Sequence, residues 1–323
     1  MNLYLYFNLY IIKKLNNNIL IEIDTSEINT SLGPGIFLKG INKLLPLYLD
    51  NCTFISSSFI NFIFKPDYYY IPILNFQEND FKKLVKQKII NKYIFGPNFV
   101  PQIWFSFPNK DTWMERRFPE ILNKTKGIAV HSKRVSQYLA EKSNTLYNIR
   151  KFKIIRACTN LNPKIIKNFN RRKIDILFFE KYADLNRQKQ GKELLYLLKK
   201  SNIKIISIMY GKYNKKIIKQ LANDSKFIIY FSFFDTGAIG LKEIQNFGVI
   251  TFTHQKDLII DNTTCFYIPE LANTDNIEAA SNKILKIMKM VNDSNPNSLL
   301  IAKKNQIINH CKNALKDLCS SLI

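Results

Sequence analysis

Short apolar runs alternate with longer segments of helical periodicity along most of the chain. The second half shows this in the order strand 174–179, helix 187–200, strand 203–208, helix 214–223, strand 226–231, strand 249–252, strand 265–268 and helix 275–291. In the last helix, Ile277, Ala280, Ile284, Ile287 and Val291 form one apolar stripe. Strands that alternate with helices indicate a parallel sheet covered on both faces, so the second half predicts an α/β domain.

The first half repeats this alternation with less regular spacing. Candidate strands lie at 19–24, 52–56, 68–74, 93–96, 102–107, 127–130 and 152–156, and candidate helices at 36–45, 79–91, 112–122 and 133–142. A polar, basic segment at 160–172 is typical of a linker. We therefore expect a first domain over residues 1–160, a second over 173–297 and a C-terminal helix over 298–323.

Composition limits the class of protein further. A chain of 323 residues suits two domains that each bury a core. The formal net charge of +23 would attract nucleic acid or an anionic membrane. Because lysines occur in every segment, together with much Asn and Ile, a solvated surface set by composition is the plainer interpretation of the charge.

The cysteines and the N-terminal segment bear on the compartment. The five cysteines are scattered and odd in number, which favours reduced thiols and a cytoplasmic protein. Residues 1–12 are apolar but fall short of the ~20 residues that span a bilayer, so a leading strand is expected there. An association with the cytosolic face of an anionic membrane is a variant of this interpretation.

Residues 225–252 hold the strongest candidate for chemistry. Asp235, Gly237, Ala238 and Gly240 stand between an apolar run and a helical segment. Small residues there let a ligand approach the backbone, and the first amides of a helix favour phosphate. Glu243 follows Asp235 by eight residues, about two helical turns, so both can face one side. A simpler interpretation is that Asp235 caps the helix and Glu243 is solvated.

This spacing resembles the acidic–x7–Glu motif of GT-B glycosyltransferases, especially the retaining family 4 (group 1). The first acid is Asp235 rather than Glu, and Thr236 precedes Gly237 where the family has Phe. The resemblance is specific over 225–252, looser over 174–200 and only architectural before residue 160. It implies two Rossmann-like domains facing a cleft, with the C-terminal helix crossing back to the first domain.

The resemblance also implies roles for single residues. Asp235 would lie near the donor sugar, where it accepts hydroxyls or stabilises an oxocarbenium-like transition state. The amides of Gly237 and Ala238 would meet phosphate, and Glu243 would hold the ribose. Gly211 falls where the family binds the nucleotide base.

The cations expected near the β-phosphate differ from the family pattern. Lys181 stands where the family has Arg, and Gln190 stands where it has Lys. Lys181, Arg187 or Lys192 could supply the charge instead. Arg187 has the further advantage that a guanidinium grips phosphate bidentately.

Two features of the first half are candidates for the cleft. Gly33 and Gly35 lie in the loop after the strand at 19–24, where GT-B proteins carry a glycine-rich cleft loop, although a plain turn also explains them. His131 ends the strand at 127–130 and could reach the cleft, or it could simply begin the next helix.

Several other chemistries lack their sequence signatures. No Asp-x-Asp occurs, which argues against the metal-dependent GT-A class, and neither a Walker A motif nor Gly-x-Gly-x-x-Gly is present. With three histidines and no cysteine cluster, a zinc site is not expected. Gly-x-Ser-x-Gly is absent as well. We therefore expect neither a metal nor a cofactor besides the donor substrate.

The sequence thus predicts an enzyme that moves a sugar from a nucleotide-diphosphate sugar to an unknown glycan, lipid or protein acceptor, with retention and without metal. One alternative is a catalytically silent nucleotide-sugar-binding protein, and another is a nucleotide-sugar epimerase. A basic nucleic-acid-binding protein is a third, although no specific nucleic-acid motif accompanies the charge.

Overall fold

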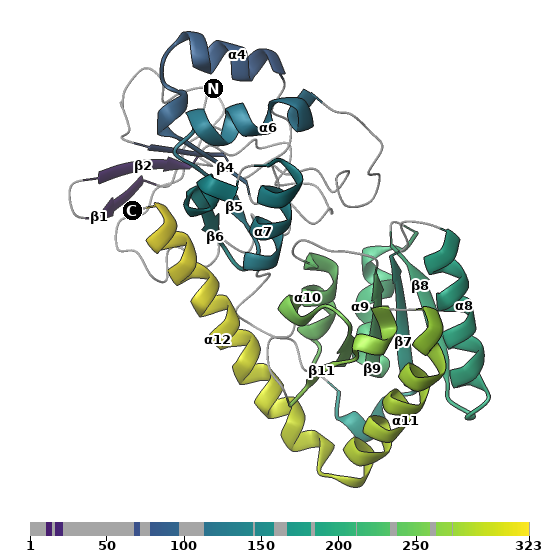
Figure 1. The fold of residues 1–323 in the computed structure, drawn as a ribbon. Helices are drawn as coiled ribbons and strands as arrows, with labels where there is room; N and C mark the ends of the chain where they lie inside the picture. The colour runs from purple at the N-terminus through teal and green to yellow at the C-terminus, as the bar shows by residue number, and fades with distance from the viewer. Residues whose placement is uncertain are drawn as a thin grey trace, which may run out of the picture. The chain divides into compact units, whose positions relative to one another are not determined.

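The chain forms two compact α/β units in a computed structural model (Figure 1). The residues described are 11–14, 17–21, 68–71, 78–96, 113–144, 146–157, 167–181, 185–210, 212–232, 238–258, 263–272 and 274–322. Unit 1 comprises Met1–Thr159 and Cys311–Ile323, and unit 2 comprises Asn160–His310.

Unit 1 contains six described strands and three described helices. The strands are β1 (Ile11–Lys14), β2 (Asn17–Ile21), β3 (Tyr68–Ile71), β4 (Tyr93–Phe95), β5 (Gly127–Val130) and β6 (Phe152–Ile154), and the helices are α4 (Glu78–Lys86), α6 (Trp113–Lys124) and α7 (Lys133–Lys142). The strands follow one another across the sheet in chain order, with β1 antiparallel to β2 and the other pairs parallel. Among these strands the order does not reverse.

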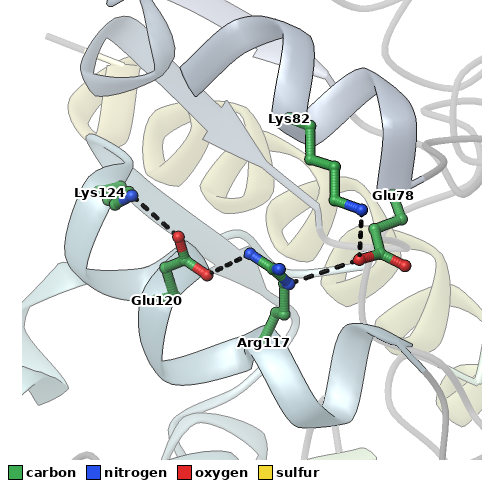
Figure 2. A network of polar contacts seen from close by, with 5 residues as sticks. All are labelled: Glu78, Lys82, Arg117, Glu120 and Lys124. Carbon is green, nitrogen blue, oxygen red and sulfur yellow. Dashed lines mark hydrogen bonds and ion pairs between the residues drawn. The ribbon is translucent and has the colours of Figure 1, made fainter. Parts of the chain in front are cut away.

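Two helices of unit 1 are joined by a network of charged side chains (Figure 2). Arg117 of α6 lies 3.5 Å from a carboxylate oxygen of Glu78 in α4 and 2.8 Å from one of Glu120. Lys82 and Lys124 extend the network to either side, at 3.1 and 2.8 Å. The hydrogen bond from Lys124 is the largest effect on Glu120 and lowers the pKa of its carboxyl, against the upward effect of burial.

A lysine closes the carboxyl end of α6. The last carbonyls of a helix lack intrahelical donors. Lys151 Nζ donates to the carbonyl oxygens of Leu122 at 3.0 Å, Asn123 at 2.5 Å and Thr125 at 3.2 Å. Burial lowers the pKa of Lys151. This cation therefore supplies the donors that the end of the helix lacks.

Unit 2 contains five described strands and five described helices. The strands are β7 (Ile174–Lys181), β8 (Ile205–Met209), β9 (Ser225–Ser232), β10 (Ile250–Thr253) and β11 (Cys265–Tyr267). The helices are α8 (Leu185–Lys199), α9 (Lys215–Asp224), α10 (Ile239–Gln245), α11 (Ile277–Asp293) and α12 (Pro296–Leu322), the last of which contributes its residues from Cys311 to unit 1.

The sheet of unit 2 is wholly parallel and buried on both faces. Its order is β11-β10-β9-β7-β8. Because side chains alternate along a strand, Phe178 and Phe231 belong to the core cluster with residues of α8 and α11, whereas Phe179 and Tyr230 belong to the cluster with residues of α9 and α10. This explains why the strands read as continuous apolar runs in the sequence.

One buried arginine makes hydrogen bonds to backbone carbonyls at the amino-terminal end of this sheet. Arg172 is 3% exposed. Its Nη1 donates to Ser225 O and its Nη2 to Phe247 O, both at 2.6 Å, and its Nε donates to Lys167 O at 3.2 Å. Burial lowers the pKa of Arg172 to about 10, although the nearby charge of Asp224 acts in the opposite direction. The guanidinium therefore stays charged at neutral pH.

The predicted alternation of strands and helices is confirmed where the structure describes it. The predicted strand at 127–130 and helix at 133–142 agree with β5 and α7 to the residue. The predicted helix at 36–45 and strands at 52–56 and 102–107 lie outside the described residues. The facing cleft and the return of the C-terminal helix stay predictions. Within the described part of the chain, no helix is both long and apolar enough to cross a bilayer.

Candidate functional site

The order of the strands in unit 2 reverses at one place. β7 is the first strand of the unit, and it pairs with β8 on one side and with β9 on the other. In open parallel sheets such a reversal leaves a crevice beyond the carboxyl ends of the strands, where ligands bind. The candidate site is this carboxyl edge, defined by the strand ends Lys181, Met209, Ser232 and Thr253 and by the described residues that follow them, which are Tyr210, Ala238, His254 and Gln255.

A lysine and an aromatic ring lie side by side at the carboxyl edge. Lys181 Nζ is 4.7 Å from the centre of the Tyr210 ring, a cation–π distance. The amide of Tyr210 donates to Glu180 O at 2.8 Å, which continues the pairing of β7 and β8. The Tyr210 side chain is 40% exposed. The edge thus offers a cation for an anionic group and an aromatic face for a planar one.

Arg187 joins three segments beneath this edge. The residue is 5% exposed, and its guanidinium carbon lies 3.7 Å from the centre of the Phe231 ring. Nη1 donates to Gln190 Oε1 at 2.9 Å and to Leu271 O. Nη2 donates to Ser232 O at 3.1 Å. Arg187 therefore fixes the end of β9 against the turn that contains Leu271.

Two residues of α8, Gln190 and Lys192, have different surroundings. Gln190, at the position where the resemblance expects a lysine, is buried and accepts the hydrogen bond from Arg187. Lys192 is exposed. Arg187 and Gln190 thus act as a pair within the fold, whereas Lys192 presents its charge to solvent.

The end of β10 carries a second group of polar residues. His254 follows the strand directly, and its Nδ1 lies 3.4 Å from Nη2 of Arg187. Gln255 is buried, its Nε2 donates to Ser232 Oγ, and its amide donates to Thr253 Oγ1 at 3.1 Å. Polar side chains at the ends of β9 and β10 therefore contact one another directly.

The residue directly before the short helix α10 has an unusual backbone conformation. Ala238 precedes it with φ 46° and ψ 47°, a left-handed conformation that favours glycine, and its side chain is buried. Such strain often marks functional sites. Lys242 is buried and donates from Nζ to Leu258 O at 3.2 Å. Glu243, the next residue, is half-buried.

His131 belongs to unit 1 and lies at the end of β5. Its ring is buried, with Nδ1 2.9 Å from Ile155 O. A carbonyl only accepts, so Nδ1 carries the proton. Ser132 caps α7, because its Oγ accepts from the amide of Val135 at 3.3 Å. The position of His131 relative to a cleft stays a prediction.

The structure brings together only part of the predicted site. Lys181 pairs in register with Ser232, to which Arg187 also donates, and Ala238 begins the next described segment after Ser232. Glu243, Lys192 and His131 are placed as given above. The predicted residues that lie outside the described part of the chain are Asp235, Gly237, Gly211, Gly33 and Gly35.

Sequence reasoning missed Ser232, His254 and Gln255. Ser232 ends β9, and His254 and Gln255 are the first two residues after β10, so all three lie at the carboxyl ends of buried strands of the parallel sheet. That position was the signal that could have found them, because the carboxyl ends of parallel strands share one edge.

Comparison with known proteins gives no close relative. No family model and no curated protein sequence matches the chain. Among solved structures, the crystal structure of TarM is similar at 13% identity and a TM-score of 0.47, covering 75% of this chain and 57% of that one.

Two further structures are similar at greater distance. The GtfA/B complex bound to UDP and GlcNAc has 11% identity and a TM-score of 0.36, covering 84% of this chain and 56% of that one. The UDP-N-acetylglucosamine 2-epimerase from Rickettsia bellii has 13% identity and a TM-score of 0.37, covering 91% and 80%. This chain spans a little over half the length of the first two proteins.

Proposed function

We propose that the chain is a GT-B-type glycosyltransferase that takes its sugar from a nucleotide-diphosphate donor bound at the carboxyl edge of unit 2. The acceptor is a glycan, lipid or protein, and the reaction proceeds with retention and without metal. The proposal includes a cytoplasmic location, at the cytosolic face of an anionic membrane if the acceptor is a lipid.

The reversal of strand order beside β7 is the observation that supports the proposal most. Lys181 and Ser232 pair in register at the carboxyl ends of β7 and β9, and the next described residues after Ser232 are those from Ala238 onward, which include Glu243. The motif that resembles family 4 therefore follows a strand at the edge where open parallel sheets bind ligands. Motif and topology were obtained from different observations, and they favour the same place.

Each residue has a role in the proposal that follows from its chemistry. Lys181 contacts the diphosphate, because its ammonium is the charge at the end of β7. Glu243 accepts the ribose hydroxyls, and the amide of Ala238 meets phosphate. Asp235 stabilises the donor sugar. Arg187 serves chiefly as an anchor, because both terminal nitrogens already donate within the protein.

A catalytically silent nucleotide-sugar-binding protein is the second candidate. The pairing of Gln190 with Arg187 favours it, because the family's second phosphate cation is replaced by a buried amide. An epimerase would share the nucleotide site. Free nucleotide formed together with a glycosylated acceptor indicates a transferase, and interconversion of sugars without an acceptor indicates an epimerase.

The test is a thermal-shift screen of UDP, GDP, ADP and CMP and of their sugar conjugates. A ligand at 100 times its dissociation constant stabilises by about 2.7 kcal/mol, which the melting temperature reports. We expect one diphosphate to stabilise the wild type and Glu243→Ala and Lys181→Ala to lose that shift. Glu193→Ala and Lys189→Ala are matched controls, because both residues are exposed on α8.

The result that contradicts the proposal is equally specific. If no nucleotide shifts the melting temperature while heparin and DNA do, in a salt-sensitive way, the charge of the chain explains binding better than the carboxyl edge does. If the controls lose the shift together with the site variants, binding is not located at this edge.

A further inference from the structure

His254 is held at the carboxyl edge by a buried arginine. The histidine is half-buried and directly follows β10, and Nη2 of Arg187 lies 3.4 Å from its Nδ1. The same Nη2 donates to Ser232 O, the last carbonyl of β9, at 3.1 Å. One buried guanidinium nitrogen thus connects the imidazole ring to the strand that borders the crevice.

This contact decides which ring nitrogen of His254 carries the proton. A guanidinium has only donors. A proton on Nδ1 would place two donors face to face beside a permanent positive charge, so Nδ1 presents its lone pair. The proton of the neutral ring is then on Nε2. His131 shows the opposite arrangement, because its Nδ1 faces a carbonyl oxygen at 2.9 Å.

The position of the ring gives this Nε2–H group a use. It lies at the end of β10, next to β9, and β9 pairs with β7 at the reversal of strand order. Lys181 at the end of β7 supplies charge, whereas His254 supplies a donor that is oriented by a buried partner. An oriented neutral donor and a cation on the same edge of the sheet suit a phosphate group, whose oxygens accept several hydrogen bonds.

We propose that His254 donates from Nε2 to the diphosphate of the bound nucleotide and that Arg187 is the positioning residue that sets its tautomer. The inference rests on the proposed function, because it needs a nucleoside diphosphate at the carboxyl edge. It adds a ligand contact that the acidic motif does not contain.

The binding test compares a diphosphate with its parent nucleoside. The probe is whichever of UDP, GDP and ADP gives the largest melting shift, titrated by calorimetry beside uridine, guanosine or adenosine. We expect His254→Leu to weaken the diphosphate by about tenfold and to leave the nucleoside unchanged, as the loss of one hydrogen bond predicts. His254→Gln, whose amide donates from a similar reach, should stay within about threefold of the wild type.

The role of Arg187 is tested by the tautomer of His254, a property that a general loss of stability does not change. Long-range nitrogen–proton NMR distinguishes the two tautomers, and the signals of His254 and His131 are identified by their loss in His254→Gln and His131→Gln. We expect His254 in the Nε2–H form and His131 in the Nδ1–H form, and we expect Arg187→Lys to give His254 a mixture of both. Arg187→Lys retains the charge, so it is the milder substitution.

The outcomes separate this inference from the proposed function. If the wild type binds a diphosphate and His254→Leu binds it equally well, the inference fails and the proposed function stands. If the wild type binds no diphosphate, the proposed function fails and the phosphate contact fails with it. A wild-type His254 in the Nδ1–H form overturns the role of Arg187 whatever binds.

Discussion

Removing Arg172 should destabilise unit 2, and a lysine there should be worse than a methionine. The guanidinium makes two charge-assisted hydrogen bonds of 2.6 Å, to Ser225 O and Phe247 O. Hydrogen bonds to charged groups contribute about 1.5–3 kcal/mol each, so Arg172→Met forfeits roughly 3–6 kcal/mol. Methionine fills much of the same volume, so little cavity energy is added.

The same substitution also removes a cost. Burial is the cause that lowers the pKa of Arg172 from its ordinary value to about 10, and that change corresponds to roughly 3 kcal/mol against the buried charge. The net loss for Arg172→Met is therefore about 0–3 kcal/mol. A lysine at this position would still bury a charge, and its ammonium is hydrated more strongly in water than a guanidinium is. A single ammonium also cannot reproduce the two divergent hydrogen bonds of the guanidinium. Arg172→Lys should therefore lose about 3 kcal/mol or more.

The assay is urea unfolding followed by circular dichroism, together with hydrogen exchange of β9, because a two-unit chain need not unfold in one step. Arg171→Met is the control, because Arg171 is the exposed neighbour. We expect faster exchange of β9 in the order wild type, Met variant, Lys variant. If the lysine variant is as stable as the wild type, Arg172 is not the buried fork on which this reasoning depends.

Three further predictions concern stability. Gly96→Ala should cost about 3 kcal/mol or more, because φ is +104° and a Cβ would lie 2.3 Å from Ala129 O. Gly240→Ala should be neutral or stabilising by about 0.5 kcal/mol, because its Cβ would meet only ordinary contacts at 3.6 Å. Thermal melts compare the two variants, and equal losses of stability would contradict the stated difference in backbone conformation. Lys151→Met should lower the free energy of unfolding in urea by about 1–2 kcal/mol, because the carbonyls at the end of α6 lose their donor. The control Lys126→Met changes an exposed lysine and should leave the free energy of unfolding unchanged. Equal effects of the two substitutions would show that the hydrogen bonds of Lys151 to these carbonyls contribute nothing. Glu120→Gln should cost about 0.5 kcal/mol at pH 7, because its charge partners are half-exposed. The pKa of Glu120 is lowered in the folded chain from an ordinary 4.5, so the stability that its charge contributes is fully present above pH 4.5 and is lost as the pH falls through the folded pKa. A difference in stability between wild type and variant that persists at pH 2 would contradict this pH dependence.

Much of unit 2 could be predicted from the sequence, because its strands are buried on both faces. Runs such as the one in β9 contain almost only β-branched and aromatic residues, and the helices between them have clear apolar stripes. The order of the strands could not be predicted in this way. A continuous apolar run shows that a strand is central, but not which strands are its neighbours.

The candidate site shows the same limit at the level of single residues. Lys181 and Arg187 are both basic residues near the end of β7, and the sequence offers both as phosphate ligands. In the structure Arg187 is 5% exposed and donates to carbonyls, whereas Lys181 lies against the exposed ring of Tyr210. Only tertiary contacts separate these roles. His254 was missed because its partner is 67 residues away in the chain.

The left-handed conformation of Ala238 could not be predicted either. Alanine is the best helix former and has no preference for positive φ. The structure nevertheless gives Ala238 a φ of 46° immediately before α10. The surrounding core, in which the alanine is buried, imposes this conformation against the local preference.

Hydrogen exchange with and without a nucleoside diphosphate tests the central claim most directly. The claim is that the ligand binds at the carboxyl edge of unit 2, and exchange reports which amides a ligand protects. With UDP, GDP or ADP at saturation, the account predicts slower exchange in peptides covering 179–190, 231–244 and 252–258, and unchanged exchange in α11. Protection confined to unit 1, or no protection by any of the three at saturating concentration, would contradict it.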